Sequence, residues 1–306
     1  MKHNVKITFL LLAMFFVTQL IGLFVIHQYS PVVKQMIDEN GTITNITSYN
    51  LPYGMDPPQD VTPQGTLISI IFAIAIAVFL MLALMKFKAE ILLRIWFFVV
   101  VILALGITFN SLLFKFPHSS LIALIIALPI AIFKIFKRNI LIHNISELLI
   151  YPGIASIFVP LLNIWSVVIL LILISLYDMY AVWHAGFMQK MAQYQIEKVK
   201  IFTGFFVPYL GKKEKQAIAR AKKSNVKDKK IKVSLAILGG GDVVFPIILA
   251  GVVFNALGLI PALIIAIGST LALAFLFYIS EKGKFYPAMP FITSGALIAL
   301  LIAYFV

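Results

Sequence analysis

The chain contains no cysteine, which excludes disulfides, thiolate metal sites and cysteine nucleophiles. Charge is also scarce, because Asp, Glu, Lys and Arg make up only 12% of the 306 residues. A soluble domain typically carries about 25% charged residues. Hydrophobic residues account for 61% of the chain and the mean hydropathy is +1.02, so lipid is the expected solvent for most of it.

Several apolar runs reach the length that an α-helix needs to cross a hydrocarbon layer about 30 Å thick. Lipid offers backbone groups no outside partner, so these runs must be helices. The first run follows three basic residues, as in a signal peptide, but it is too long and lacks a small-residue cleavage site. The sequence therefore predicts an all-α polytopic membrane protein with nine transmembrane helices, at about 7–27, 66–86, 91–114, 119–136, 140–162, 164–187, 233–256, 259–280 and 286–306.

The fifth of these spans is the weakest, because polar residues interrupt it near one end. They are His143, Asn144, Ser146 and Glu147. We expect an interfacial or protein-facing turn there, since exposure of these side chains to lipid would be costly.

The net charge of +13 predicts orientation in a membrane rather than binding to nucleic acid. Lys and Arg fall between the apolar runs, whereas nucleic-acid binders collect them on a folded face. With a cytoplasmic N-terminus, only Lys34 and Lys115 lie outside, and the basic cluster 190–232 lies inside. The bias toward one side predicts a cytoplasmic N-terminus and an extracytoplasmic C-terminus.

Two loops are long and divide the chain. The first, 28–65, is polar and carries glycosylation sequons at Asn40 and Asn45 on the expected outer side. The second, 188–232, is basic, and its apolar middle at 201–210 is expected to touch the membrane surface. We expect an N-terminal bundle of six helices at 1–187, a cytoplasmic loop at 188–232 and a C-terminal bundle of three helices at 233–306.

Among twelve acidic residues, only Asp178 and Asp242 lie well inside strongly apolar spans. A carboxylate buried in a membrane costs several kcal/mol, so each is a candidate functional residue. Asp178 is about eight residues from the cytoplasmic end of its predicted helix, and Asp242 about nine from the end of its own. At about 1.5 Å per residue, both carboxyls are expected roughly 12 to 14 Å below the cytoplasmic face, where adjacent helices can present them to each other.

Two carboxyls at close range in a low-dielectric site share one proton. The ionised one can take a proton from water while the other donates to the substrate carbonyl oxygen or the leaving nitrogen. This chemistry hydrolyses a peptide bond without a metal or other cofactor. Serine chemistry would need a positioned base, and His184, the nearest histidine, is expected to pack at the interface instead.

Two motifs flank the acidic pair. Gly239, Gly240 and Gly241 precede Asp242, which removes side chains for a full turn and permits close approach of a helix or a substrate backbone. The run Pro287-Ala288-Met289-Pro290 opens the last predicted span. Two prolines leave carbonyls without helical partners there and favour an irregular turn beside the acids, although proline is also ordinary at a helix N-terminus.

Together these residues resemble the presenilin and signal peptide peptidase family of GxGD intramembrane aspartyl proteases. The family's Tyr-Asp motif matches Tyr177-Asp178, and its Gly-x-Gly-Asp motif matches 239–242. The Pro-Ala-Leu motif matches Pro287-Ala288-Met289, where methionine replaces the usual leucine at similar volume. The resemblance covers nearly the whole chain, and its short loops are those of a microbial, archaeal-type homologue.

The resemblance implies that Asp178 and Asp242 are catalytic, and that the glycine and proline motifs shape the site. It implies single-span membrane proteins as substrates, cleavage near the cytoplasmic side, and a loop after the sixth helix that holds an unwound substrate strand, at Phe205–Leu210 or just before Val233. It also implies an enzyme that acts without accessory subunits, whether or not it forms an oligomer. Paired intramembrane acids leave a proton-coupled transporter or a silent membrane scaffold as alternatives.

Overall fold

The computed structural model describes residues 5–37, 43–58, 62–87, 89–137, 139–185, 194, 199, 201–209, 234–281 and 286–305. Within that part of the chain the architecture is a bundle of apolar helices, eight of them long enough to cross a membrane and one shorter. The helices are α1 (Val5–Gln28), α2 (Pro63–Lys86), α3 (Glu90–Leu112), α4 (Ser119–Phe136), α5 (Ile140–Phe158), α6 (Ile164–Tyr180), α9 (Gly240–Leu257), α10 (Leu259–Ile279) and α11 (Met289–Ala303).

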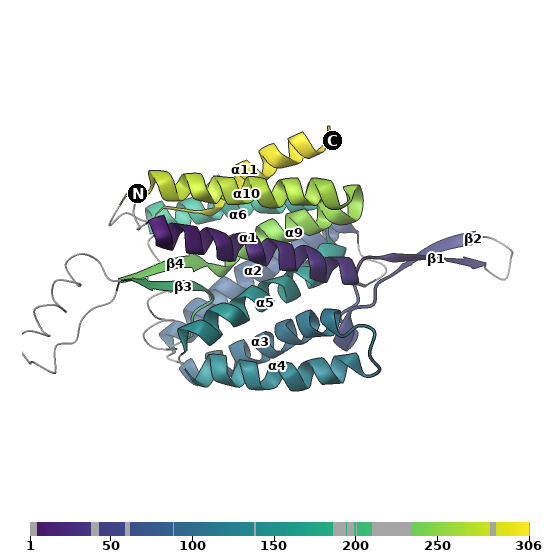
Figure 1. Cartoon of the computed structure of the whole chain (residues 1–306), viewed down its shortest axis with the longest axis horizontal. Coiled ribbons are helices and arrows are strands. Elements are labelled where there is room, and N and C mark those ends of the chain that lie inside the picture. Colours follow the sequence, from purple (N-terminus) through teal and green to yellow (C-terminus); the bar gives the residue numbers. More distant parts are fainter. Residues whose placement is uncertain are drawn as a thin grey trace, which may run out of the picture.

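Two antiparallel hairpins stand at opposite ends of the bundle (Figure 1). Strands β1 (Val32–Ile37) and β2 (Ile43–Ser48) pair at one end. At the other end β3 (Gly204–Tyr209) pairs with β4 (Ser234–Gly239), which leads directly into α9. The prediction of an all-α membrane fold is confirmed, and these short hairpins are the addition that the sequence reading missed.

Helix α9 lies inside the bundle and positions the site. It packs against α1, α5, α6 and α10, and most of its residues from Val243 to Val253 are buried. Helices α10 and α11 pack closely because small residues face each other: a Cβ placed on Gly268 would lie 2.5 Å from the Cβ of Ala299. The core is therefore continuous from α1 through α9 to α11.

Side-chain caps set where α5 and α6 begin. The Asn139 side chain accepts hydrogen bonds from the backbone N–H groups of Leu141 and Ile142, and Asn163 accepts one from Ser166 at 2.8 Å. Helix α6 ends at Tyr180 and continues into a π-helical turn, Ala181–Ala185. A change of winding thus follows directly after the last turn of α6.

The seventh predicted helix begins later than the sequence reading placed it. Residues 234–239 form strand β4, and α9 begins only at Gly240. Glycine has a high conformational cost in a helix, and the segment before it finds its backbone partners in β3. The prediction that Asp242 lies about nine residues inside a helix is therefore wrong, because Asp242 lies in the first turn of α9.

The apolar stretch 201–210 is mostly strand. Strand β3 occupies residues 204–209 of it and packs onto the helices. Phe205 is fully buried, and Val207 is 7% exposed. Gly204 lies at a positive φ of +149°, and a Cβ there would come within 2.4 Å of the Leu238 carbonyl oxygen. Only glycine fits this start of the hairpin.

The polar stretch in the fifth span is protein-facing, as expected, although α5 continues through it as a helix instead of turning. Ser146 and Glu147 are buried, and His143 and Asn144 contact β3. Of the two sequons, Asn40 lies outside the described residues and Asn45 lies in β2. The basic stretch 210–233 also lies outside the described residues.

Candidate active site

Asp178 lies in the last turn of α6, just before the π-helical turn, and is 7% exposed. The backbone N–H of Met289 donates to its Oδ2 at 3.1 Å, and the N–H of Ala288 faces the same carboxyl. Two backbone donors from the start of α11 therefore hold an acid that is otherwise surrounded by apolar helices.

Asp242 approaches the same region from a different kind of element. It lies half-buried in the first turn of α9, where unpaired backbone N–H groups favour a carboxylate. Its Oδ2 lies beside Gly239, where an added Cβ would be only 3.1 Å away. The strand-to-helix junction thus places the carboxyl next to a residue without a side chain.

The two carboxyls interact electrostatically across the contact between α6 and α9. The two acids lie together, as predicted from the sequence, but the predicted geometry of equal depths along two helices is wrong. In the structure the end of α6 meets the start of α9, and the strand β4 supplies the residues that had been counted as helix.

The start of α11 completes the site. Pro287 and Met289 are buried, and Ala288 is half-buried. One turn away from the Asp178 contact, Ser175 Oγ donates to Thr293 Oγ1 at 2.8 Å between two buried side chains. This bond holds α6 against α11 at the level of the acid, because an unpaired hydroxyl would be costly in lipid.

The three glycines have different surroundings. A Cβ on Gly240 would lie 2.8 Å from the ring and from the hydroxyl of Tyr151, so only glycine fits against α5 there. Gly241 is exposed, and a Cβ there would meet nothing closer than Phe245 at 3.8 Å. The glycine run therefore has a packing position at 240 and an open position at 241.

Tyr177 and His184 differ in their relation to the acids. Tyr177 is 36% exposed, and its phenol interacts electrostatically with Asp178. His184 is exposed and stacks on Tyr180, with 5.8 Å between the ring centroids. The structure thus agrees with the packing role expected for His184, and brings no base to the acids from it.

Sequence reasoning missed two buried residues that position Asp242. Gln19 of α1 is fully buried, and its amide donates to the carbonyl of Val243 at 3.2 Å. Tyr151 of α5 packs against Gly240 and meets Phe205 edge-to-face. A polar glutamine inside an apolar span was the available signal for Gln19. The signal for Tyr151 is weak, since tyrosine is common in membrane helices.

The largest cavity described here is not part of this site, and no metal site accompanies the acids within the part of the chain that the structure describes. A cavity of about 820 Å³ lies at the opposite ends of the same helices, lined by Asn163 of α6, Asn255 of α9 and Tyr304 beside α11, among others. In the described residues, no group of three or more His, Asp or Glu side chains is placed to hold a metal ion.

A bundle of membrane-length helices with two facing aspartates defines a polytopic membrane protein with an intramembrane acid pair. The fold is similar to two solved structures of a presenilin family intramembrane aspartate protease. In space group C222 the TM-score is 0.61 at 19% identity, covering 97% of this chain and 98% of that one. In space group P2 the TM-score is 0.59 at 19% identity, with 96% of each chain covered. A search of curated proteins gives no match.

A family model described as signal-peptide peptidase, presenilin aspartyl protease, matches residues 43–306. The chain belongs to this family. It is accordingly an intramembrane aspartyl protease and an integral multi-pass membrane protein, and the transporter and scaffold alternatives are set aside.

Proposed function

We propose that Asp178 and Asp242 are the catalytic residues of this protease and hydrolyse peptide bonds inside transmembrane segments of substrate proteins. The observation that carries the proposal is their meeting at one place, with backbone donors from α11 on the first and the α9 N-terminus under the second. The ionised carboxyl takes a proton from the attacking water while the protonated one donates its proton to the carbonyl oxygen, which gives a tetrahedral diol. The first carboxyl then delivers the proton it took from water to the leaving nitrogen, and the second recovers its own from a diol hydroxyl as the C–N bond breaks, which restores the starting state. No cofactor takes part in this cycle.

The neighbouring motifs have separate roles in this proposal. Ala288 and Met289 fix the Asp178 carboxyl through backbone N–H groups, and the buried Pro287 shapes the turn that presents them. Gly239, Gly240 and Gly241 keep the approach to Asp242 free of side chains, so that a substrate backbone can come close. Tyr177 flanks the pair and contacts the substrate.

The substrates are single-span membrane proteins, and their helix must unwind before the cut, because a helix shields its peptide bonds. The β3–β4 hairpin beside Asp242 supports this view, since a sheet edge binds an extended segment through main-chain hydrogen bonds. Of the two stretches considered from the sequence, 205–210 falls largely on β3. The segment just before Val233 lies outside the described residues, and β4 follows it directly.

Orientation and assembly complete the proposal. The distribution of Lys and Arg supports a cytoplasmic N-terminus and an extracytoplasmic C-terminus, with the hairpin β3–β4 on the cytoplasmic side. The enzyme acts without accessory subunits. The bundles 1–187 and 233–306 each contribute one acid, and the loop 188–232 contributes β3.

The experiment is cleavage of a detergent-solubilised single-span substrate by the parent protein and by Asp242→Ala, with product masses read by mass spectrometry. Products cut inside the membrane segment that vanish in the variant support the proposal. Proton flux is measured on both proteins in vesicles. A folded parent protein that cuts no substrate at any pH would overturn the proposed protease function.

A further inference from the structure

The position of Asp242 depends on how α9 begins. The junction between β4 and α9 consists of Gly239, Gly240 and Gly241, and Asp242 follows directly. Three residues without side chains offer no side-chain packing of their own. The direction in which α9 starts, and with it the place of the Asp242 carboxyl, must therefore be fixed by neighbouring elements.

Strand β3 is the first of these neighbours. Gly204 pairs with Gly239 in the antiparallel register, at the end of the hairpin where α9 begins. One residue further on, the Gly240 N–H donates to the Thr203 carbonyl at 3.3 Å. The start of α9 is thus attached to the β3 segment through the main chain, so a contact that holds β3 also holds the junction.

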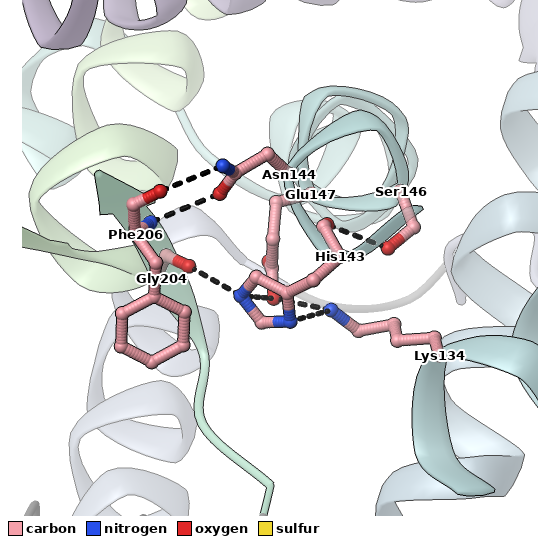
Figure 2. A network of polar contacts seen from close by, with 7 residues as sticks. All are labelled: Lys134, His143, Asn144, Ser146, Glu147, Gly204 and Phe206. Carbon is pink, nitrogen blue, oxygen red and sulfur yellow. Dashed lines mark hydrogen bonds and ion pairs between the residues drawn. The ribbon is translucent and has the colours of Figure 1, made fainter. Parts of the chain in front are cut away.

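Helix α5 holds β3 through two adjacent side chains (Figure 2). The Asn144 amide donates to the Phe206 carbonyl at 2.7 Å and accepts from the Phe206 N–H at 2.9 Å. His143 Nε2 donates to the Gly204 carbonyl at 2.7 Å. A carboxamide carries the same donor and acceptor as a peptide group, so Asn144 matches the main chain of Phe206. Three hydrogen bonds therefore fasten β3 to α5 in one register.

The same side of α5 also reaches α9. Tyr151 lies about two helical turns after Asn144, so both side chains lie on one face. Tyr151 is 3% exposed, and a Cβ on Gly240 would lie 2.8 Å from its hydroxyl. Its ring meets Phe205 of β3 edge-to-face, with 5.7 Å between the ring centroids. Tyr151 therefore packs against both the strand and the first residue of α9.

A buried ion pair fixes this face of α5. Lys134 of α4 and Glu147 of α5 meet at 2.5 Å, with side chains only 2% and 1% exposed. The same ammonium lies 3.2 Å from His143 Nδ1, and both bonds are drawn in Figure 2. Because Nδ1 accepts from lysine, the ring carries its proton on Nε2, which is the atom that donates to Gly204. Glu147 also interacts electrostatically with the Tyr151 hydroxyl one turn further along.

We propose that His143, Asn144 and Tyr151 are positioning residues for Asp242, which hold the junction between β4 and α9 in place before a substrate arrives. The Lys134–Glu147 pair is their support, a role that fits a buried ion pair because such pairs add little net stability. A displacement of about 1 Å at a reacting group can cost on the order of a hundredfold in rate, so a glycine junction needs such a support. The inference rests on the proposed function, because it explains how one acid of that reaction is placed.

The first test separates kcat from KM. Asn144→Leu keeps a side chain of similar size but loses both bonds to Phe206. Because α5 acts on the junction and not on the substrate, we expect kcat per folded protein to fall about tenfold while KM stays within about twofold of the parent. A loss of stability alone would lower the amount of folded protein but not its kcat. A higher KM at unchanged kcat would overturn the inference.

His143 allows a conservative comparison. A glutamine side chain can still donate to the Gly204 carbonyl, so His143→Gln should retain cleavage, whereas His143→Leu cannot donate and should lower kcat about tenfold. Ser146→Ala is the matched control, since the buried Ser146 lies on the same helix and donates to the His143 carbonyl of that helix (Figure 2). It should leave kcat unchanged. Equal kcat values for the two His143 variants would overturn the inference.

Hydrogen exchange tests the junction without substrate. In the parent the Gly240 amide should be protected, because it donates to the Thr203 carbonyl. In Asn144→Leu, His143→Leu and Tyr151→Leu it should exchange about tenfold faster, while amides in the middle of α10 exchange as in the parent. Unchanged exchange of the Gly240 amide in these variants would overturn the inference. Absence of cleavage by the unsubstituted protein would instead refute the proposed function, on which the exchange measurement does not depend.

Discussion

Met289 donates its backbone N–H to Asp178 Oδ2 at 3.1 Å, which ties the first turn of α11 to the last turn of α6. The contact comes from the main chain, so the identity of the side chain at 289 matters only for packing. This explains how methionine can stand at the third position of the Pro-Ala-Leu motif that Pro287-Ala288-Met289 resembles. The carboxyl meets the same donor in either case.

Met289→Leu should therefore keep cleavage within about twofold of the parent, because the swap conserves volume at a buried position. Met289→Ala removes buried methylene groups and should lower the free energy of unfolding by about 2 to 5 kcal/mol. Initial cleavage rates and thermal unfolding midpoints measure the two effects. A large loss of cleavage in a stable Met289→Leu protein would mean that the side chain itself contacts the reacting groups.

The acid pair should give a bell-shaped dependence of kcat/KM on pH. When both carboxyls are protonated, no base remains, and when both are ionised, no acid remains. Activity therefore needs the singly protonated state of the pair. Asp178→Asn and Asp242→Asn should each abolish cleavage. The profile is measured with a solubilised substrate, and the unfolding midpoint is followed over the same range. A flat profile from a folded protein would argue against shared-proton chemistry.

Gly240 and Gly241 should respond differently to substitution. Gly240→Ala pushes a methyl group into Tyr151, so it should destabilise the protein by about 1 to 3 kcal/mol. Gly241→Leu faces open space, so it should leave the unfolding midpoint nearly unchanged but impair cleavage by obstructing the approach to Asp242. Normal turnover by Gly241→Leu would show that this glycine has no part in substrate access.

Most of the bundle could be predicted from the sequence, because apolar run length and the absence of backbone partners in lipid determine it almost alone. The predicted span 119–136 coincides with α4, and 259–280 differs from α10 by one residue. The acid pair could be found for the same reason, since Asp178 and Asp242 are the acids that lie well within strongly apolar stretches.

The hairpin could not be predicted. Residues 235–238 are apolar, and such a run fits a membrane helix as well as a strand. What decides the outcome is a partner far along the chain: β3 lies about 30 residues earlier and is itself held by Asn144 of α5. Long-range pairing leaves no local periodicity in the sequence, so the start of α9 and the contact between β3 and α5 are seen only in the structure.

Orientation can be tested at the two ends of α4. Lys115→Cys and Lys137→Cys introduce an exposed thiol on each side of this helix in a chain without other cysteines. With a cytoplasmic N-terminus, a membrane-impermeant thiol reagent applied to intact cells should label the Lys115→Cys protein and spare Lys137→Cys until the cells are opened. The reverse pattern would invert the proposed topology.

Replacing one partner of the Lys134–Glu147 ion pair should destabilise the protein more than replacing both partners. Lys134→Met alone leaves a buried carboxylate without its partner, and Glu147→Leu alone leaves a buried ammonium without its partner, so each should destabilise the protein by about 3 to 5 kcal/mol. The double variant Lys134→Met with Glu147→Leu leaves no buried charge and should recover much of that loss.

Thermal unfolding of the four proteins gives the coupling between the two residues as a double-mutant cycle. Lys137→Met is the control on the same helix, because Lys137 is exposed and lies over the Phe133 ring at 4.6 Å, so its loss should be small. Cleavage by the double variant should stay below the parent even where stability is recovered, since His143 loses the lysine that fixes its ring against Gly204. Additive single losses would show that the pair does not act as a unit.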